Sequence, residues 1–266
     1  MKLNWDMLRE RSGQEINNYL FYDNGDLVGF LGIYQFHSKE VEISGMVHPQ
    51  HRRKGIVGEL VRAAVQGCVL RGISKLIFIC SNGSSSGKAF LEALGAQYSF
   101  SEYWMQLDES AGRAGIAKNV QEIKLRLAEP NDLSTIANLN AIGFDMTQAD
   151  ALKFTEETQG SPTTLTYVAE VRTEDENMRS VGKIDVRLEN SKAFIFGFVV
   201  AAEERGRGYG RTILNDTIAA VKEKDRTASI ALEVAVKNER ALSLYESSGF
   251  RVSMITDYYD LVIMND

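Results

Sequence analysis

Short runs in which apolar and polar residues alternate follow one another along the chain, and they predict β-strands separated by amphipathic helices. In the second half, we expect strands at 124–127, 164–171, 181–189, 193–200, 229–234 and 251–262, the last broken near Asp257. We expect one helix within 133–158, a second from 210 to about 222 and a third over 239–247. Strands that alternate with helices in this way indicate an α/β fold with a mixed sheet.

The first half repeats part of this order. We expect strands at 17–22, 27–35, 41–47, 76–80 and 98–107, and helices at 57–71 and 87–94. Residues 47–52 align with 200–205 without a gap, and 94–96 fall on 248–250. An internal duplication explains the matching order, and it predicts two tandem domains at 1–115 and 122–266. The polar stretch 109–119 is the expected linker.

The two halves differ in length before their shared pattern begins. About forty residues separate Lys124 from the strand at 164, whereas sixteen residues precede the strand at 17. The first domain therefore lacks a full opening strand and helix, either because it is reduced or because this chain starts late.

Composition narrows the class of protein. With 266 residues, 44% hydrophobic and 25% charged, the chain can bury a core, which excludes intrinsic disorder. Its longest apolar run, 193–202, is too short to span a membrane, and the N-terminus lacks the apolar stretch of a signal peptide, so we expect a cytoplasmic protein. The net charge of −6 argues against nucleic-acid binding and slightly favours a cationic substrate.

The cysteines and histidines do not indicate a metal site. Two cysteines and three histidines lack zinc-ligand spacing, and no metal is expected. Cys68 and Cys80 lie in apolar surroundings, where they are expected to be buried as small hydrophobic residues.

The strongest chemical signal is the glycine-rich segment 205–211, which lies between an apolar strand and a helix. Glycines at alternate positions allow a tight turn with successive N–H groups pointing inward, and the helix adds the positive end of its dipole. Such a junction suits a pyrophosphate. The segment lacks the spacing of a dinucleotide fingerprint and the Walker lysine. Residues 83–89 superficially suggest a P-loop, but Ala89 replaces the magnesium-binding hydroxyl.

Two signatures together resemble the GNAT superfamily of acyl-CoA-dependent N-acetyltransferases. Arg205, Gly208 and Gly210 match the pyrophosphate loop R/Q-x-x-G-x-G/A. The second signature is matched by Leu232-Glu233-Val234, Asn238, Ala241, Leu244-Tyr245 and Gly249-Phe250. The resemblance covers 124–262 well and 17–107 less well. The tandem build is similar to that of relatives of mycothiol synthase, so it implies two GNAT folds, the N-terminal one reduced.

The resemblance implies an acyltransferase that moves an acetyl group from acetyl-CoA to a primary amine by direct attack, in the second domain. The pantetheine of the cosubstrate would pair with Phe198, Val199 and Val200. Its pyrophosphate would bind the loop, that is, Arg205, Gly206, Arg207, Gly208, Tyr209, Gly210 and Arg211. Asn238 matches a residue that contacts the pantetheine or an ordered water.

Two residues are candidates for proton transfer. Tyr245 matches the general acid of the family, and the usual tyrosine pKa of about 10 lies above the thiol pKa of about 8.5, so transfer to the leaving thiolate requires good positioning. Glu233 is the candidate base, working through desolvation or a water relay. It is equally consistent with a solvated or ion-paired strand residue. Asp185 and Glu170 are reserve candidates, and Tyr258 and Tyr259 are expected to pack in the core.

The first domain departs from the family at three positions. Val57 replaces the small residue of the loop, Ser84 falls near the asparagine position, and Leu91 replaces the tyrosine. We therefore expect this domain to be structural. The retained Arg52 and Gly55 leave open whether it still binds acyl-CoA.

Two other functions fit the same residues. One is a non-catalytic sensor or partner-binding module that holds acyl-CoA, and the other is acyl transfer to a precursor of a thiol cofactor. The acceptor would be a small-molecule or peptide amine selected by 133–158 and 251–261, with no nucleic-acid or membrane partner. The chain is expected to be a monomer or a homodimer.

Overall fold

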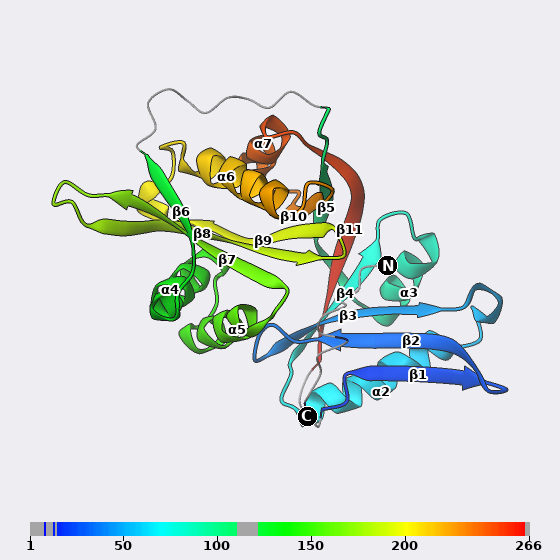
Figure 1. Ribbon diagram of the computed structural model, residues 1–266. Coiled ribbons are helices and arrows are strands. Elements are labelled where there is room, and N and C mark those ends of the chain that lie inside the picture. Colours follow the sequence, from blue (N-terminus) through cyan, green and yellow to red (C-terminus); the bar gives the residue numbers. More distant parts are fainter. Residues whose placement is uncertain (1–7, 9–12, 14, 111–121, 264–266) are drawn as a thin grey trace. The chain divides into compact units, whose positions relative to one another are not determined.

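The computed structural model describes residues 8, 13, 15–110 and 122–263, and most of the expected linker, 111–119, lies outside these residues (Figure 1). The chain forms two compact units: unit 1 is Met1–Ser101 with Ile255–Asp266, and unit 2 is Glu102–Met254. Both combine helices with mixed strands, which confirms the α/β class. None of the helices in the described ranges is long and apolar enough to cross a membrane.

Unit 2 is built on a mixed sheet. Its strands are β6 (Ile123–Leu127), β7 (Thr164–Arg172), β8 (Met178–Glu189), β9 (Lys192–Val200) and β10 (Ser229–Ala235), with parts of β5 (Gln97–Leu107) and β11 (Phe250–Val262). The order is β11-β5-β10-β9-β8-β7-β6. The β9–β10 pair is parallel, whereas the pairs from β6 to β9 and the β5–β10 pair are antiparallel.

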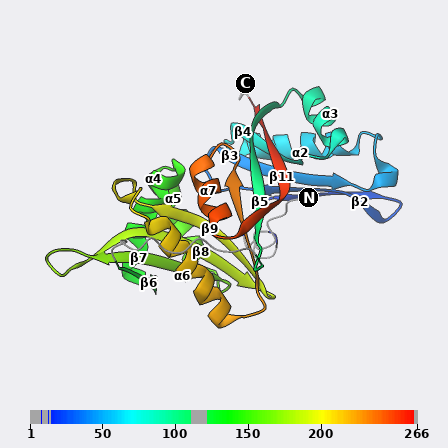
Figure 2. The same cartoon turned by 90° about the horizontal axis from the view of Figure 1, so that it is seen from above.

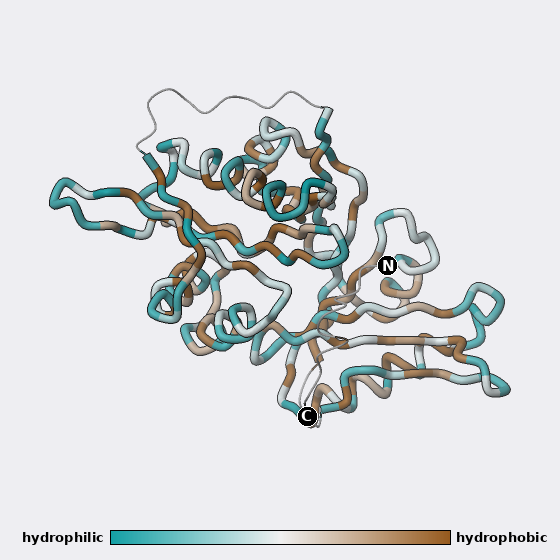
Figure 3. Tube along the Cα trace, viewed as in Figure 1, coloured by the Kyte–Doolittle hydropathy of each residue, from teal (hydrophilic) through white to brown (hydrophobic). Residues whose placement is uncertain are grey.

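Helices cover both faces of this sheet. Figure 1 shows α4 (Leu133–Phe144) and α5 (Gln148–Gly160) on one face, and α6 (Tyr209–Lys224) and α7 (Glu239–Ser247) on the other. The main core lies under α6, where Ile213 and Ile218 pack with Ile184 and Val186 of β8. The central strands of this sheet carry mostly hydrophobic residues, and the helices mix hydrophobic with hydrophilic ones (Figure 3).

Two local expectations need correction. The segment 133–158 is two helices, because Asp145 takes a left-handed conformation (φ 53°) and the Thr147 side chain accepts a hydrogen bond from the N–H of Asp150 at 3.1 Å. Strand β11 is continuous through Asp257, which pairs with Cys80 of β4 (Lys75–Ser81). The Asp257 carboxylate is buried but satisfied, with Ser101 donating at 2.7 Å and Lys88 at 2.8 Å.

Unit 1 repeats a shorter version of the same plan. Its strands are β1 (Asn18–Asp23), β2 (Asp26–Tyr34), β3 (Glu40–Val47) and β4, followed by parts of β11 and β5. The helices α2 (Ile56–Leu70) and α3 (Ser85–Leu94) lie on one side of these strands (Figure 2). Within 15–101 and 255–263 there is no counterpart of β6, α4 and α5.

Four residues expected to be buried are buried. Cys68 and Cys80 belong to the hydrophobic core of unit 1. Tyr258 stacks on Phe100 with ring centroids 4.3 Å apart, and Tyr259 packs edge-on against Tyr98. The two tyrosines therefore pack in unit 1, as expected.

The units of packing differ from the repeats in the sequence, because the last strand of each repeat runs on into the other unit. Residues 102–106 of β5 pair with β10 in unit 2, and residues 256–262 of β11 pair with β4 in unit 1. The division of the sequence at 1–115 and 122–266 stays a prediction about the repeats.

Candidate functional site

Unit 2 contains a cleft of about 860 Å³ where β9 and β10 stop pairing. The parallel pairing of these strands extends only to Ile195 and Leu232. Beyond it, the following residues of both strands line the cleft, together with the glycine-rich loop and α7. The predicted strand residues Phe198, Val199 and Val200 all lie along this cleft.

The glycine-rich loop closes one end of the cleft. Gly206 (φ 85°) and Gly208 (φ 87°) take the left-handed conformation that favours glycine, and α6 begins at the next residue. The Arg205 guanidinium donates to the carbonyl of Val200 at 3.0 Å, which fixes the loop to the end of β9. The backbone is thus arranged to present N–H groups at a helix N-terminus, as an anion site requires.

The loop brings all but one of its predicted residues to the cleft. The lining residues are Arg205, Gly206, Gly208, Tyr209, Gly210 and Arg211. Arg207 instead forms an ion pair with Glu204 at 3.4 Å, and Arg179 of β8 approaches the same buried carboxylate at 2.5 Å. These contacts give the Arg207 side chain a role in holding the loop.

A bulge in β9 shapes the cleft wall. The register between β8 and β9 shifts between Lys183 and Asp185, opposite Gly197, which has φ 55°. A Cβ on Gly197 would lie 2.2 Å from a carboxylate oxygen of Asp185, so only glycine fits. Lys183 and Asp185 are fully buried and paired at 2.5 Å. The structure therefore places the reserve candidate Asp185 in an ion pair behind the cleft wall.

Tyr245 of α7 reaches the cleft from the core. Its side chain is 8% exposed and packs edge-on against Phe250 with ring centroids 6.0 Å apart. Burial raises the pKa of Tyr245 to about 12. The phenol is therefore protonated around neutral pH and available as a proton donor.

Asn238 lines the cleft and also begins α7. Its side-chain oxygen accepts a hydrogen bond from the N–H of Ala241 at 3.1 Å, which is an N-cap. Sequence reasoning expected only a ligand contact here. The cap leaves the amide nitrogen of the side chain directed elsewhere, so both roles are compatible.

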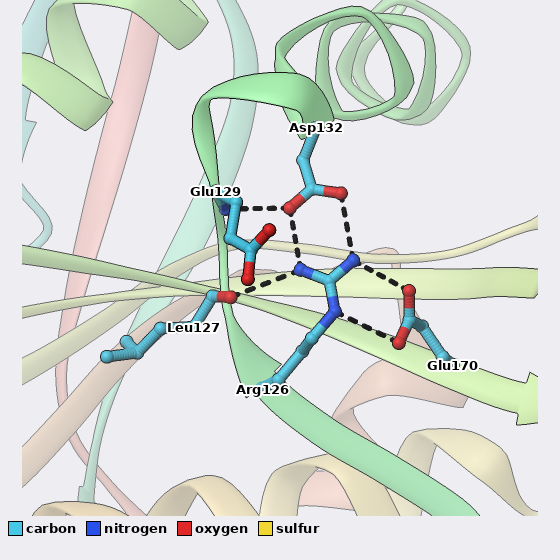
Figure 4. Close-up of polar contacts among 5 residues, drawn as sticks. All are labelled: Arg126, Leu127, Glu129, Asp132 and Glu170. Atoms are coloured by element: carbon cyan, nitrogen blue, oxygen red, sulfur yellow. Dashed lines mark hydrogen bonds and ion pairs between the residues drawn. The ribbon is translucent and has the colours of Figure 1, made fainter. Parts of the chain in front are cut away.

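Glu233 and Glu170 lie in different surroundings. Glu233 lines the cleft from β10, opposite Trp104 of β5. Glu170 of β7 instead forms a two-point contact with Arg126 of β6, at 2.6 and 3.0 Å (Figure 4). Arg126 also binds Asp132 at 2.6 and 2.9 Å. Hydrogen bonds from Arg126 lower the pKa of the Asp132 carboxyl, although burial opposes this. Glu170 is thus a member of an ion network that fixes the start of α4.

The cleft lining includes residues that sequence reasoning did not single out, among them Glu102, Gly143 and Phe144. Glu102 reaches it from β5, opposite Ala235, although it belongs to the first half of the sequence. Gly143 and Phe144 reach it from the end of α4. A Cβ on Gly143 would lie 2.6 Å from Val199, so α4 packs closely on β9. Nothing local marks Glu102, because its position depends on strand pairing between the repeats.

Unit 1 copies the loop backbone without its chemistry. Gly55 (φ 83°) begins α2 as Gly208 begins α6, and Arg52 donates to the carbonyl of Val47 at 3.1 Å. Ser84 caps α3 by accepting from the N–H of Gly87. Val57 and the buried Leu91 stand where unit 2 has Gly210 and Tyr245. Within the described parts of the chain, no cluster of three or more metal-binding side chains occurs.

A protein-family model matches most of the chain. The model of the Acetyltransferase (GNAT) family matches residues 2–96 and 135–250. A comparison with curated protein sequences finds no match.

Solved structures share the fold at low sequence identity. A GCN5-related N-acetyltransferase from Sphaerobacter thermophilus is 18% identical, with a TM-score of 0.77 over 97% of this chain and 85% of that one. A tandem GNAT protein from the clavulanic acid biosynthesis pathway is 17% identical, with a TM-score of 0.72 over 100% of this chain and 90% of that one. A glucosamine N-acetyltransferase region of a fungal β-N-acetylglucosaminidase is 16% identical, with a TM-score of 0.71 over 93% of this chain and 33% of that one.

The Arg126 network yields a stability prediction. Arg126→Ala leaves the buried Glu170 and the partly buried Asp132 without their cation, so it should lower the free energy of unfolding by about 3 kcal/mol. Lys153→Ala, which removes a side chain that is 74% exposed on α5, is the control and should change it by less than about 0.5 kcal/mol. Urea unfolding at neutral pH measures both. Equal values for the two variants would contradict the structural role of the network.

Proposed function

This chain belongs to the GNAT acetyltransferase family, and from that premise we propose that it is a cytoplasmic, acetyl-CoA-dependent N-acetyltransferase whose active site is the cleft of unit 2. The observation that carries the proposal is that one cavity is lined by the glycine-rich loop, the unpaired end of β9 and Tyr245. Each of these features suits a different part of acetyl-CoA: the loop suits the pyrophosphate, the edge of β9 suits the pantetheine, and Tyr245 suits the thioester sulfur. The acceptor is a primary amine of a small molecule or peptide.

Binding of the cosubstrate uses the backbone. The unpaired edge of β9 at Phe198–Val200 offers N–H and carbonyl groups to the amides of the pantetheine, as a further strand would. The loop offers its N–H groups and the dipole of α6 to the pyrophosphate. Arg205 and Arg211 add positive charge beside the same site.

The reaction is a direct attack of the amine on the thioester carbonyl. Glu233, directly or through a water, takes a proton from the ammonium so that the neutral nitrogen can form the C–N bond. When the C–S bond breaks, the hydroxyl of Tyr245 protonates the departing thiolate, and the second proton of the nitrogen passes through water to restore the Tyr245 hydroxyl. The products are the amide and free CoA, with one proton released overall.

Cofactor binding by the loop can be tested by giving unit 2 the valine that unit 1 has at the matching position. Gly210→Val reproduces Val57, and a Cβ at this position meets nothing closer than Leu244 at 3.4 Å, so the fold accommodates it. The side chain would occupy space needed by the pyrophosphate and should raise the Kd for acetyl-CoA at least about tenfold.

Isothermal titration calorimetry measures this Kd. Gly58→Val is the matched control, since it adds the same side chain to the first turn of α2, where the space is open. An unchanged Kd in Gly210→Val, or an equal loss in Gly58→Val, would overturn the cofactor site.

The general acid can be tested by removing one hydroxyl. Tyr245→Phe should lower kcat about a hundredfold with little change in the KM for acetyl-CoA. Because the pKa of Tyr245 is about 12, the wild type should show no loss of kcat from this group below about pH 11. Tyr167→Phe, which removes the hydroxyl of another buried tyrosine of unit 2, should keep full activity.

Steady-state rates from pH 6 to 10 provide the measurement. If Tyr245→Phe retains the wild-type kcat throughout, the acid role is wrong. If the wild type binds acetyl-CoA but transfers acetyl to no amine of a broad panel, a non-catalytic sensor replaces the enzyme.

A further inference from the structure

A row of aromatic side chains crosses the sheet of unit 2 beside the cleft. Trp104 of β5 stacks on Phe194 of β9 with ring centroids 5.2 Å apart, and Phe194 is stacked with Phe196 at 6.2 Å. Phe196 itself lines the cleft. All three side chains are partly exposed. We call Trp104, Phe194 and Phe196 the aromatic stripe.

The strand register explains how rings from non-adjacent strands meet. Strand β10 runs between β5 and β9, and its Ala231 stands opposite Phe194 on one side and Gln106 on the other. A methyl group leaves the space above β10 open, so Trp104 and Phe194 can stack across it. The core of unit 2 does not use this face of the three strands: its residues from β10 are Ile230, Leu232 and Val234, on the opposite face.

The same face carries two carboxylates at the cleft. Glu233 stands opposite Trp104, and Glu102 stands opposite Ala235, two residues further along β10. Directly opposed residues share a face, so Glu102 and Glu233 are diagonal neighbours with Cα atoms about 7–8 Å apart. Both line the cleft and both are partly exposed. A single ammonium group can approach both carboxylates.

The rings already accept a cation within the protein. The Arg187 guanidinium of β8 lies 5.2 Å from the centre of the Phe196 ring, a cation–π distance. The face therefore combines negative charge with aromatic surface, and this combination suits an organic cation that carries an apolar group. A small polar amine without such a group, such as ethanolamine, would leave most of the aromatic stripe without a contact.

We infer that the acceptor is a primary amine attached to an aromatic or extended apolar group, with its ammonium between Glu102 and Glu233 and its apolar part on the aromatic stripe. This inference rests on the proposed function and adds the substrate class. Glu102 is then a positioning residue for the acceptor. The first repeat contributes to the site of the second through the strand that it adds to the sheet of unit 2.

The experiment measures amine binding by calorimetry with the full chain saturated with CoA, so it does not depend on turnover. The probes are 2-phenylethylamine and ethylamine, which share the ammonium and differ in the ring. The wild type should bind 2-phenylethylamine at least about tenfold more tightly. Trp104→Ala should abolish most of this preference while leaving ethylamine unchanged, and Trp104→Phe should retain it.

A second pair of variants measures the contribution of charge to amine binding separately from that of the aromatic surface. Glu102→Gln keeps the shape of the side chain and should weaken both amines about tenfold without changing the Kd for CoA. Gln106→Ala, on the same strand and face but outside the cleft, is the matched control and should change neither.

Equal affinity of the wild type for the two amines, or unchanged binding in Glu102→Gln, would overturn the inference. Failure of the inference differs from failure of the proposed function. A protein that acetylates other amines with no preference for the ring keeps the function and loses the inference. A protein that binds 2-phenylethylamine through Glu102 but transfers no acetyl group keeps this site and loses the function.

Discussion

The site depends on one constraint, which is that the parallel strands β9 and β10 pair only as far as Ile195 and Leu232. Strands that part leave N–H and carbonyl groups unpaired, and these groups require another partner. The bulge at Gly197 lies beside this opening, and the buried Lys183–Asp185 pair leaves no room for a side chain there. A buried ion pair is costly to desolvate, so its position behind a ligand-binding wall is consistent with shaping the site rather than with stabilising the fold.

The two units share the backbone of this arrangement, and the proposed function assigns the chemistry to unit 2 alone. Both units have a left-handed glycine before the helix, an arginine bound to the preceding strand and a capped second helix. At the loop and at α7, the residues that differ include Val57 in place of Gly210 and Leu91 in place of Tyr245. The last strand of the first repeat also places Glu102 and Trp104 in the sheet of unit 2.

Local signals in the sequence were enough to predict the α/β class, the tandem plan, most strands and the loop. These predictions succeed because turns, helix caps and strand periodicity each depend on residues that are close together in the sequence. The features that were not predicted depend on distant partners. Glu102 enters the cleft through pairing with β10, Glu170 is held by Arg126, and Arg207 pairs with Glu204. The division of 133–158 into two helices depends on Asp145, whose left-handed conformation leaves no periodic signal.

The central claim is that the chain binds one acyl-CoA, and binds it in unit 2. Amide hydrogen exchange of the full chain with and without acetyl-CoA tests this claim directly, because it reports on both loops in one experiment. The account predicts slower exchange in the peptides that cover 198–211 and unchanged exchange in those that cover 47–58. Slower exchange at 47–58, or no change at either loop, would contradict it.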